Sequence, residues 1–364
     1  MKSFTYNALP ARVIFGSDTL PQIAQEIKNL GCTKALVLTT PQQIPEGELV
    51  LKLIGPELGA GIYSEATMHT PTDITEKAVA RAQELKADCV ISVGGGSTTG
   101  LGKAIALRTG LKQIAVPTTY AGSEASATPI IGETSGSVKK TQKTMKVLPN
   151  VIVYDVKLSL TLPPRMTLTS GVNAVAHAVE ALYSTDSNPI IDGLALQGIT
   201  AIARALPQIM HSPPDSESLF SARSDALFGA WACGTCLGAV GMSLHHKICH
   251  TLGGTFNLPH ADTHTVILPH AMAYNAPYAK ETMKQIVSAL KDAGLAAESA
   301  PGAVWDLVKS LDGPMSLREL GMREEDLDKA ADIASGNPYP NPAPLERDKL
   351  KKLLQDAWNG IRPE

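Results

Sequence analysis

The sequence has few aromatic residues and no excess of either charge. Aromatic residues make up 4% of the 364 residues, and 32 Lys and Arg stand against 35 Asp and Glu, which gives a formal charge of -3 and a pI near 6.3. A chain with this balance has no electrostatic reason to bind nucleic acid or an anionic membrane. We therefore expect neither as a partner.

Cysteine is also scarce, with five residues in the chain. Because five is an odd number, the cysteines cannot all pair in disulfides within the chain. They do not suggest a disulfide framework, and they fit a protein of the reducing cytoplasm. Cys233 and Cys236 form a CxxC pair, a pattern that redox proteins use. The pair lies in the small-residue segment 229–238, without the strand-to-helix setting of a thioredoxin-type site. We expect these two cysteines to pack between helices.

Export and membrane-spanning signals are missing as well. Residues 1–16 lack the cationic start and apolar core of a secretory signal. The apolar stretch 226–244 is interrupted by Gly, Cys, Thr and Ser and runs directly into His245 and His246, whereas a membrane span needs about 20 apolar residues. We expect no transmembrane helix and a cytoplasmic location.

The first part of the chain alternates short β-rich runs with helical patterns. Residues 34–39, 88–93 and 113–117 predict buried strands, and residues 76–86 predict an amphipathic helix between two of them. Strands that alternate with helices predict a Rossmann-like parallel sheet covered on both faces. We expect an α/β dinucleotide-binding domain over residues 1–160.

The pattern changes after that sheet. Residues 130–155 predict a hairpin with a turn at 133–136, followed by a last strand, Val151–Asp155. Beyond residue 160 the sequence is almost wholly helical, apart from a short β-branched run at 265–268. We expect an all-helical catalytic domain over residues 161–364, with the cofactor in the cleft between the two domains.

A run of three glycines follows the predicted strand 88–93. Gly94, Gly95 and Gly96 let the main chain turn sharply and approach a ligand without Cβ clashes. Ser97 or Thr98 is expected to cap the next helix, whose first N–H groups suit a pyrophosphate. Tight turns also use glycine triplets, but the strand-loop-helix setting favours a nucleotide.

Two further loops follow predicted strands. Thr39 is followed by neutral residues, so no acid is placed to grip a ribose 2′-hydroxyl, and NADP stays possible beside NAD. Residues 117–124 are rich in hydroxyl groups, which indicates either a ligand-binding loop or a capped turn. The basic run Lys139, Lys140, Lys143 and Lys146 indicates a solvated face. The residues predicted to bind the cofactor are Thr39, Thr40, Gly94, Gly95, Gly96, Ser97, Thr118 and Thr119.

Histidines concentrate in the helical half. His246 and His250 are spaced i, i+4, so they share a helix face, and His260 follows where the chain can double back. Asn173 and His177 have the same spacing on another helix. Convergent imidazoles bind metals, transfer protons or hold anions. His69, His211, His245, His264 and His270 are expected to be ordinary interior or surface residues.

Whether this cluster binds a metal stays open at this point. The position spaced for an anionic ligand holds Asn173, and an amide is a weak donor to a divalent ion. Three-histidine sites do bind zinc. A cavity of imidazoles with Lys247 nearby suits a negatively charged substrate equally well, so the sequence leans away from a metal without settling the point.

Several motifs resemble the iron-containing alcohol dehydrogenase family over nearly the whole chain. They are Gly94–Ser97, Pro117–Thr119, Asn173–Glu180 and the run from His246 to Pro269. The family's metal-binding pattern, Asp-x3-His and two later histidines, maps onto Asn173, His177, His246 and His260, so the first ligand has changed from Asp to Asn. The resemblance places His250 near the nicotinamide.

Other departures from the family pattern agree with that change. The GGGSxxDxxK motif lacks its Asp, Tyr120 follows Thr119, and Ala261 stands where PHG has its last glycine. The combination looks like the maleylacetate reductase branch, which acts without a required metal. The resemblance implies reduction of the carbon–carbon double bond of maleylacetate to 3-oxoadipate by NADH or NADPH in aromatic-compound degradation, in a homodimer.

The residues suit an enone flanked by two carboxylates. Hydride addition β to the ketone leaves an enolate, whose spread charge imidazole donors can stabilise, whereas an alkoxide needs a Lewis acid. We expect His177, His246, His250 and His260 to line the cavity, with His250 or His246 as proton donor. Asn173, Tyr120 and Lys247 are expected to orient the carboxylates.

Three other functions are compatible with this fold. The nearest is a metal-dependent alcohol or polyol dehydrogenase. A lyase or synthase that uses NAD transiently is the second, and a non-catalytic nucleotide sensor is the third. A sensor does not need convergent proton-transfer groups, so the histidines disfavour it.

Overall fold

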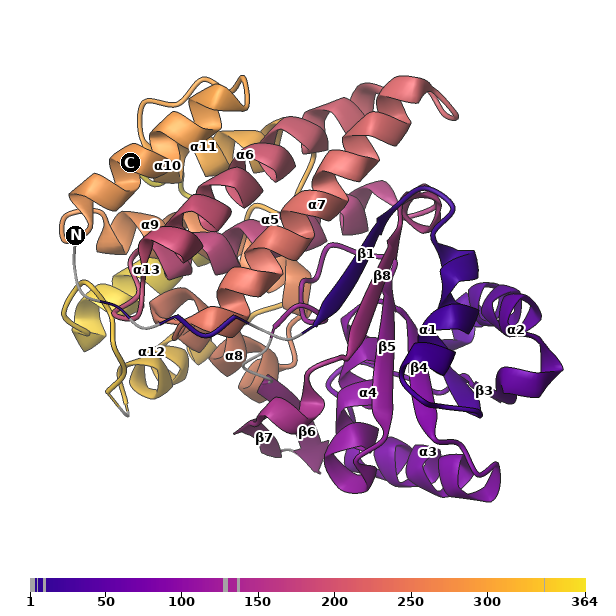
Figure 1. Ribbon diagram of the computed structural model, residues 1–364. Coiled ribbons are helices and arrows are strands. Elements are labelled where there is room, and N and C mark those ends of the chain that lie inside the picture. The colour runs from indigo at the N-terminus through magenta and orange to yellow at the C-terminus, as the bar shows by residue number, and fades with distance from the viewer. Residues whose placement is uncertain (1–3, 5, 9–10, 127–129, 136–137, 337) are drawn as a thin grey trace. The chain divides into compact units, whose positions relative to one another are not determined.

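The computed structural model describes residues 4, 6–8, 11–126, 130–135, 138–336 and 338–364. Its contacts divide the chain into two compact units (Figure 1). The α/β unit comprises residues 7–162. The helical unit comprises residues 163–364 and takes in the start of the chain, where Tyr6 packs against its core.

A six-stranded parallel sheet forms the centre of the α/β unit. The strand order is β1-β8-β5-β4-β2-β3. The strands are β1 (Arg12–Gly16), β2 (Ala35–Leu38), β3 (Gly59–Tyr63), β4 (Cys89–Gly94), β5 (Lys112–Pro117) and β8 (Val151–Asp155). The parallel sheet and the helical second half confirm the predicted fold class. Strands β1 and β3 were not predicted from the sequence.

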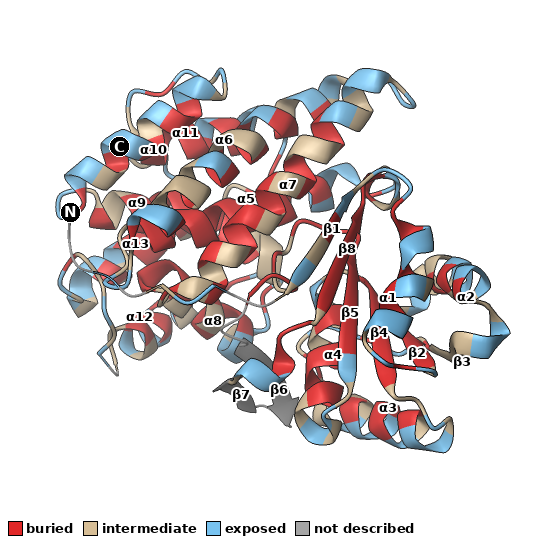
Figure 2. Cartoon of the chain, viewed as in Figure 1, coloured by how far each residue is buried: buried red, intermediate tan, exposed pale blue. Residues whose placement is uncertain are grey.

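Helices cover both faces of this sheet. They are α1 (Ile23–Asn29), α2 (Ile44–Leu58), α3 (Thr72–Glu84) and α4 (Gly96–Thr109). Alternate side chains of a strand point to opposite faces, so Val37 joins the core with α1 and α2, while Leu36 and Leu38 join the core with α3 and α4. Strands β2, β4 and β8 are accordingly buried along their whole length (Figure 2).

A separate antiparallel hairpin follows β5. Strands β6 (Ile130–Ser135) and β7 (Val138–Lys143) pair with Ser135 opposite Val138. The hairpin is therefore confirmed, but the turn predicted at 133–136 is wrong, because the strand continues through Ser135. The side chains of Lys139, Lys140 and Lys143 lie outside the described part of the structure, and Lys146 is exposed.

The helical unit is built around α5 (Pro164–Leu182), which is buried from Thr167 to Leu182. The other long helices are α6 (Pro189–His211), α7 (Glu217–Ala239), α8 (Leu244–Phe256), α9 (His260–Asn275), α10 (Lys280–Asp292), α11 (Ala300–Ser310), α12 (Leu327–Ser335) and α13 (Arg347–Asn359). The β-branched run at 265–268 lies inside α9 and is helical. Tertiary packing overrides its strand propensity there.

Small residues let α6 and α7 approach closely. A Cβ added to Gly198 would lie 2.6 Å from the Cys233 sulfur, so there is no room for a larger side chain. Cys233 and Cys236 are fully buried in α7, which confirms that they serve packing. Among the described residues, α6 is the single helix long and apolar enough to cross a membrane, and α7 with α8 qualifies only as a pair bent by 95°. The apolar side chains of α6 line the core of the helical unit.

Candidate active site

The strand order of the α/β unit reverses between β2 and β4. From β2 the chain goes to the edge strand β3, returns across β2 to β4, and then continues the other way to β5. Ligands of open parallel sheets bind outside the carboxyl ends of the strands at such a switch point. The loops after β2, β4 and β5 carry the residues predicted to bind the cofactor.

The glycine loop opens directly into a helix. Helix α4 begins at Gly96, with Gly95 as its N-cap and no side-chain cap. The predicted capping by Ser97 or Thr98 is wrong, because Thr98 Oγ1 instead donates to the Gly95 carbonyl at 2.9 Å. The first N–H groups of α4 have no intrahelical partner, and Gly96 is exposed. This arrangement suits an anion.

Two of the glycines are required by their surroundings. Gly94 has φ of 142°, and a Cβ there would lie 2.3 Å from Gln43 Oε1. A Cβ on Gly95 would lie 2.9 Å from the Thr119 methyl carbon. At Gly96 the nearest atom to an added Cβ is the Ala121 Cβ at 3.9 Å. The space beside Gly96 is therefore not filled by the protein.

Gln43 joins the three loops, and sequence reasoning missed it. Its Nε2 donates to Thr118 Oγ1 at 2.8 Å, and its Oε1 accepts from Thr40 Oγ1 at 3.3 Å. The Thr118 N–H donates to the Gly94 carbonyl at 3.0 Å. A polar residue four positions after Thr39 is too weak a pattern to identify this role.

A buried lysine holds the loop after β5. Lys103 Nζ donates to the Ser123 carbonyl at 2.5 Å and to Ser126 Oγ at 3.0 Å. Nearby, Tyr154 Oη donates to Glu124 Oε1 at 2.8 Å. Burial lowers the pKa of Lys103 to about 8 and raises the pKa of Glu124. These contacts fix the loop that also carries Thr118 and Thr119.

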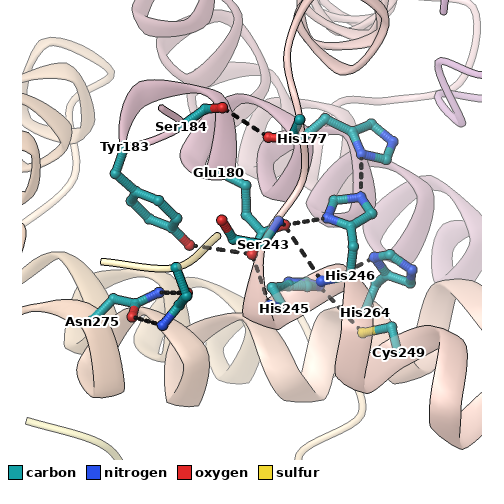
Figure 3. Close-up of polar contacts among 12 residues, drawn as sticks. His177, Glu180, Tyr183, Ser184, Ser243, His245, His246, Cys249, His264 and Asn275 are labelled. Carbon is teal, nitrogen blue, oxygen red and sulfur yellow. Dashed lines mark hydrogen bonds and ion pairs between the residues drawn. The ribbon is translucent and has the colours of Figure 1, made fainter. Parts of the chain in front are cut away.

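In the helical unit, imidazoles from three helices converge (Figure 3). Helix α5 supplies His177, α8 supplies His246 and His250, and α9 supplies His260. His177 Nδ1 and His246 Nε2 are hydrogen-bonded at 2.8 Å. The ring centroids of His246 and His250 are 6.1 Å apart, and those of His250 and His260 are 6.5 Å apart. The four predicted histidines therefore form one cluster.

A buried carboxylate organises this cluster. Glu180 Oε2 bonds His246 Nδ1 at 2.7 Å. The same carboxylate accepts the N–H groups of Ser243 at 2.8 Å and His245 at 2.7 Å, so it caps the start of α8 (Figure 3). Sequence reasoning gave Glu180 no role. Its spacing from His177, one helical turn on the same face, was the available signal.

A second layer of side chains lies against His246. His245 Nε2 is 3.1 Å from His264 Nδ1 and 3.3 Å from Cys249 Sγ. The His264 ring centroid is 4.3 Å from that of His260 and 5.1 Å from that of His246. His245 and His264 were expected to be ordinary residues, and the structure instead brings both into the cluster. The spacing of His264 from His260, i, i+4 on the same helix, was the available signal for His264.

Exposure separates the histidines into two groups. His246 is 4% exposed, and both of its ring nitrogens have partners within the protein. His250 and His260 are only half-buried. A molecule that reaches the cluster from solvent therefore meets His250 and His260 first.

Three other predicted residues lie in different surroundings. Asn173 is buried on α5, one turn before His177. Lys247 holds its ammonium over the Tyr339 ring, 5.8 Å from the centroid. Tyr120 is buried in the α/β unit, in the loop after β5. Their assignment to substrate carboxylates stays a prediction.

Burial sets the charge of the cluster. It lowers the pKa of His245 and His246 to about 3 and holds the pKa of His264 well below its usual range. It also raises the pKa of Glu180, while nearby His245 and three main-chain N–H groups act in the opposite direction. At neutral pH these three imidazoles are uncharged, so each has one donor and one acceptor nitrogen.

The family's metal-binding positions do not form a ligand set in this geometry. In the described part of the chain, two groups of three His, Cys, Asp or Glu residues have ligand atoms that all lie within 4.8 Å of one another. Neither group includes His177, His246 or His260. No choice of one ring nitrogen from each of His177, His246 and His260 brings all three within that distance. A divalent ion at these positions would need different side-chain orientations.

Comparison with known proteins identifies the family of the chain. The family model for iron-containing alcohol dehydrogenase matches residues 10–156, and that for the Fe-containing alcohol dehydrogenase family, C-terminal, matches residues 167–358. The chain belongs to the iron-containing alcohol dehydrogenase family and is an oxidoreductase. It is 50% identical over 363 residues to maleylacetate reductase of Burkholderia cepacia, with 100% of each chain covered. It matches the crystal structure of maleylacetate reductase from Agrobacterium tumefaciens with a TM-score of 0.92 at 48% identity, again over 100% of both chains.

Proposed function

We propose that this enzyme reduces the carbon–carbon double bond of maleylacetate to 3-oxoadipate with NADH or NADPH, without a metal at the histidine cluster. Full-length relatives named maleylacetate reductase support the substrate. The observation that carries the proposal is the buried chain from Glu180 through His246 to His177, which uses ring nitrogens for hydrogen bonds within the protein.

The cofactor is assigned to the carboxyl ends of β2, β4 and β5. The N-terminus of α4 at Gly96 and Ser97 would take the pyrophosphate, because its N–H groups are open and Gly96 leaves space. Thr39, Thr40, Thr118 and Thr119 supply hydroxyl groups at the same edge. The nicotinamide supplies the hydride when it is bound.

Hydride addition to the carbon β to the ketone of the enone leaves an enolate that must be stabilised and protonated. Neutral imidazoles can donate hydrogen bonds to the enolate oxygen. We assign the proton donation to His250, because it is half-buried and reachable, whereas His246 is enclosed and bonded at both nitrogens. His246 then has a supporting role next to His250, and its bond to Glu180 fixes its orientation.

The substrate's two carboxylates need partners as well. We assign this task to Asn173, Tyr120 and Lys247, with His177 and His260 completing the lining. The proposal includes a role in the bacterial degradation of aromatic compounds and a homodimeric assembly in the cytoplasm.

The test is turnover of maleylacetate by metal-free enzyme. The protein is produced in metal-depleted medium, its metal content is measured, and NADH or NADPH oxidation is followed in excess chelator. We expect full turnover, with 3-oxoadipate as product. Activity that disappears in chelator and returns with iron or zinc would instead identify a metal-dependent alcohol dehydrogenase, the rival function on this fold.

A further inference from the structure

Behind the histidine cluster lies a second set of metal-type ligands that the proposed reaction does not use. His245 and Cys249 are one turn apart on α8, and His264 faces them from α9 (Figure 3). The ligand atoms His245 Nε2, Cys249 Sγ and His264 Nδ1 all lie within 4.8 Å of one another. We call these three residues the Cys-His-His triad.

The spacing of the triad is close to that of tetrahedral zinc ligands. With Zn–N near 2.05 Å and Zn–S near 2.3 Å, two ligands at the tetrahedral angle are about 3.3 Å apart for N and N, and about 3.6 Å apart for N and S. The observed distances are 3.1 Å between the two nitrogens and 3.3 Å between sulfur and nitrogen. In these two contacts, shifts of about 0.3 Å would reach the tetrahedral distances. The third pair of ligand atoms, Cys249 Sγ and His264 Nδ1, lies within 4.8 Å.

Hydrogen bonds alone do not satisfy the triad. A ring nitrogen has either one N–H or one lone pair, yet His245 Nε2 faces both His264 Nδ1 and Cys249 Sγ. At most one of the two contacts can be a full hydrogen bond. The outer nitrogens, His245 Nδ1 and His264 Nε2, are buried without a hydrogen-bond partner. A bound ion would take the lone pairs of both inner nitrogens and so account for the shared contact at His245 Nε2, while the outer nitrogens would carry the ring protons.

The described residues contain one other group of three metal-type ligands, and its carboxylate has hydrogen-bond partners within the protein. It consists of Cys32, Asp88 and Cys89. There Asp88 Oδ2 accepts the Thr33 N–H at 2.7 Å, and Oδ1 accepts the Lys34 N–H at 2.8 Å. The carboxylate is thus already used to hold the loop, and this group is a structural contact.

We propose that the Cys-His-His triad binds one zinc-like divalent ion per chain, and that the ion links α8 to α9. A thiolate with two neutral imidazoles suits zinc or cobalt rather than magnesium or calcium. Binding replaces the Cys249 S–H bond by a metal–sulfur bond and releases the proton to solvent. The ion adds a cross-link behind His246 and is separate from the family's metal-binding positions.

The experiment uses full-length protein produced in cobalt-supplemented, zinc-depleted medium, because His245 and His264 are 0% exposed and an ion has to enter as the chain folds. We expect one cobalt per chain and a near-ultraviolet thiolate-to-cobalt charge-transfer band. Cys249→Ser and, independently, His264→Gln should abolish the band. His177→Ala and Cys236→Ala should keep it, since one alters a family metal position and the other a packing cysteine.

Three results would overturn the proposal. They are a wild-type protein without bound cobalt, bound cobalt without the thiolate band, and a band that survives Cys249→Ser. Thermal unfolding adds a second readout, since wild type produced in zinc-supplemented medium should have a higher Tm than wild type produced without zinc, whereas Cys249→Ala should show no such difference. The turnover of maleylacetate by Cys249→Ala, measured in chelator, tests the proposed function separately. The proposed reaction does not use the triad, so this variant should stay active whether or not the triad binds an ion.

Discussion

The two candidate sites are made from different parts of the protein. In the α/β unit the ligand surface is main chain, exposed by three glycines at the start of α4. In the helical unit it is side chains, brought together from α5, α8 and α9 around the buried Glu180. A main-chain site depends on side chains being absent, so its signature is short and local. A side-chain site depends on convergence, and His177 and His246 are 69 residues apart.

The largest effect is expected at the reachable edge of the side-chain site. His250→Ala should lower kcat by about 10²- to 10⁴-fold if His250 donates the proton. Steady-state kinetics with maleylacetate at saturating NADH measures this. His211→Ala, on a surface histidine bonded to the Pro207 carbonyl, should leave kcat unchanged. Wild-type turnover in His250→Ala would remove His250 from this role.

Lys103→Met tests the buried lysine that holds the loop after β5, beside the main-chain site. Burial lowers the pKa of Lys103 to about 8, below its usual 10.5, so the folded protein loses this proton before the unfolded chain does. Wild type should therefore gain stability relative to the variant as pH rises from about 8 to about 10.5, by up to about 3 kcal/mol. Urea unfolding at several pH values measures the gap.

The control for this pH dependence is Lys284→Met, at a lysine on the protein surface. Its stability difference from wild type should stay constant over the same range. A fall in the stability of wild type relative to Lys103→Met as pH rises would contradict the expected direction.

The organising carboxylate of the side-chain site is tested by Glu180→Gln. The amide keeps one oxygen and places its NH2 group against the N–H of either Ser243 or His245, so the variant should lose about 1–3 kcal/mol of stability. Loss of the orienting bond to His246 should lower kcat by about 10- to 100-fold.

A structural role alone would lower stability without this kinetic change. Glu180→Gln is therefore assayed well below its Tm, and Glu281→Gln, in an exposed ion pair with Lys284, serves as the matched control. An unchanged kcat in folded Glu180→Gln would limit Glu180 to capping α8.

Local patterns predicted the fold wherever a segment's own sequence decides its structure. The apolar runs of β2, β4, β5 and β8 were predicted because both faces of a parallel sheet are buried. Strand β3, Gly59–Tyr63, has a glycine at its first and third positions and gives no such run. Strand β1 forms its pairs with β8, 139 positions later in register, so its state depends on a distant partner.

The sites divide in the same way. The glycine loop and the i, i+4 histidine spacings were visible in the sequence. Glu180 and Gln43 were not identified, because their roles depend on contacts between elements that a linear pattern does not show. The predicted capping by Ser97 or Thr98 failed because the helix starts earlier, within the glycines.

The smallest effect tests whether the main-chain site holds the cofactor. Gly96→Ala adds a methyl group whose nearest neighbour would be the Ala121 Cβ at 3.9 Å, so the fold should tolerate it and Tm should not fall. A pyrophosphate seated on the N-terminus of α4 would meet that methyl, and KM for NADH should rise about 10-fold, or about 1.4 kcal/mol. Gly193→Ala, on α6 with nothing within 4 Å of the added carbon, should change neither value. Because no protein atom lies closer than 3.9 Å to the added methyl group, an unchanged KM would place the pyrophosphate elsewhere on the protein.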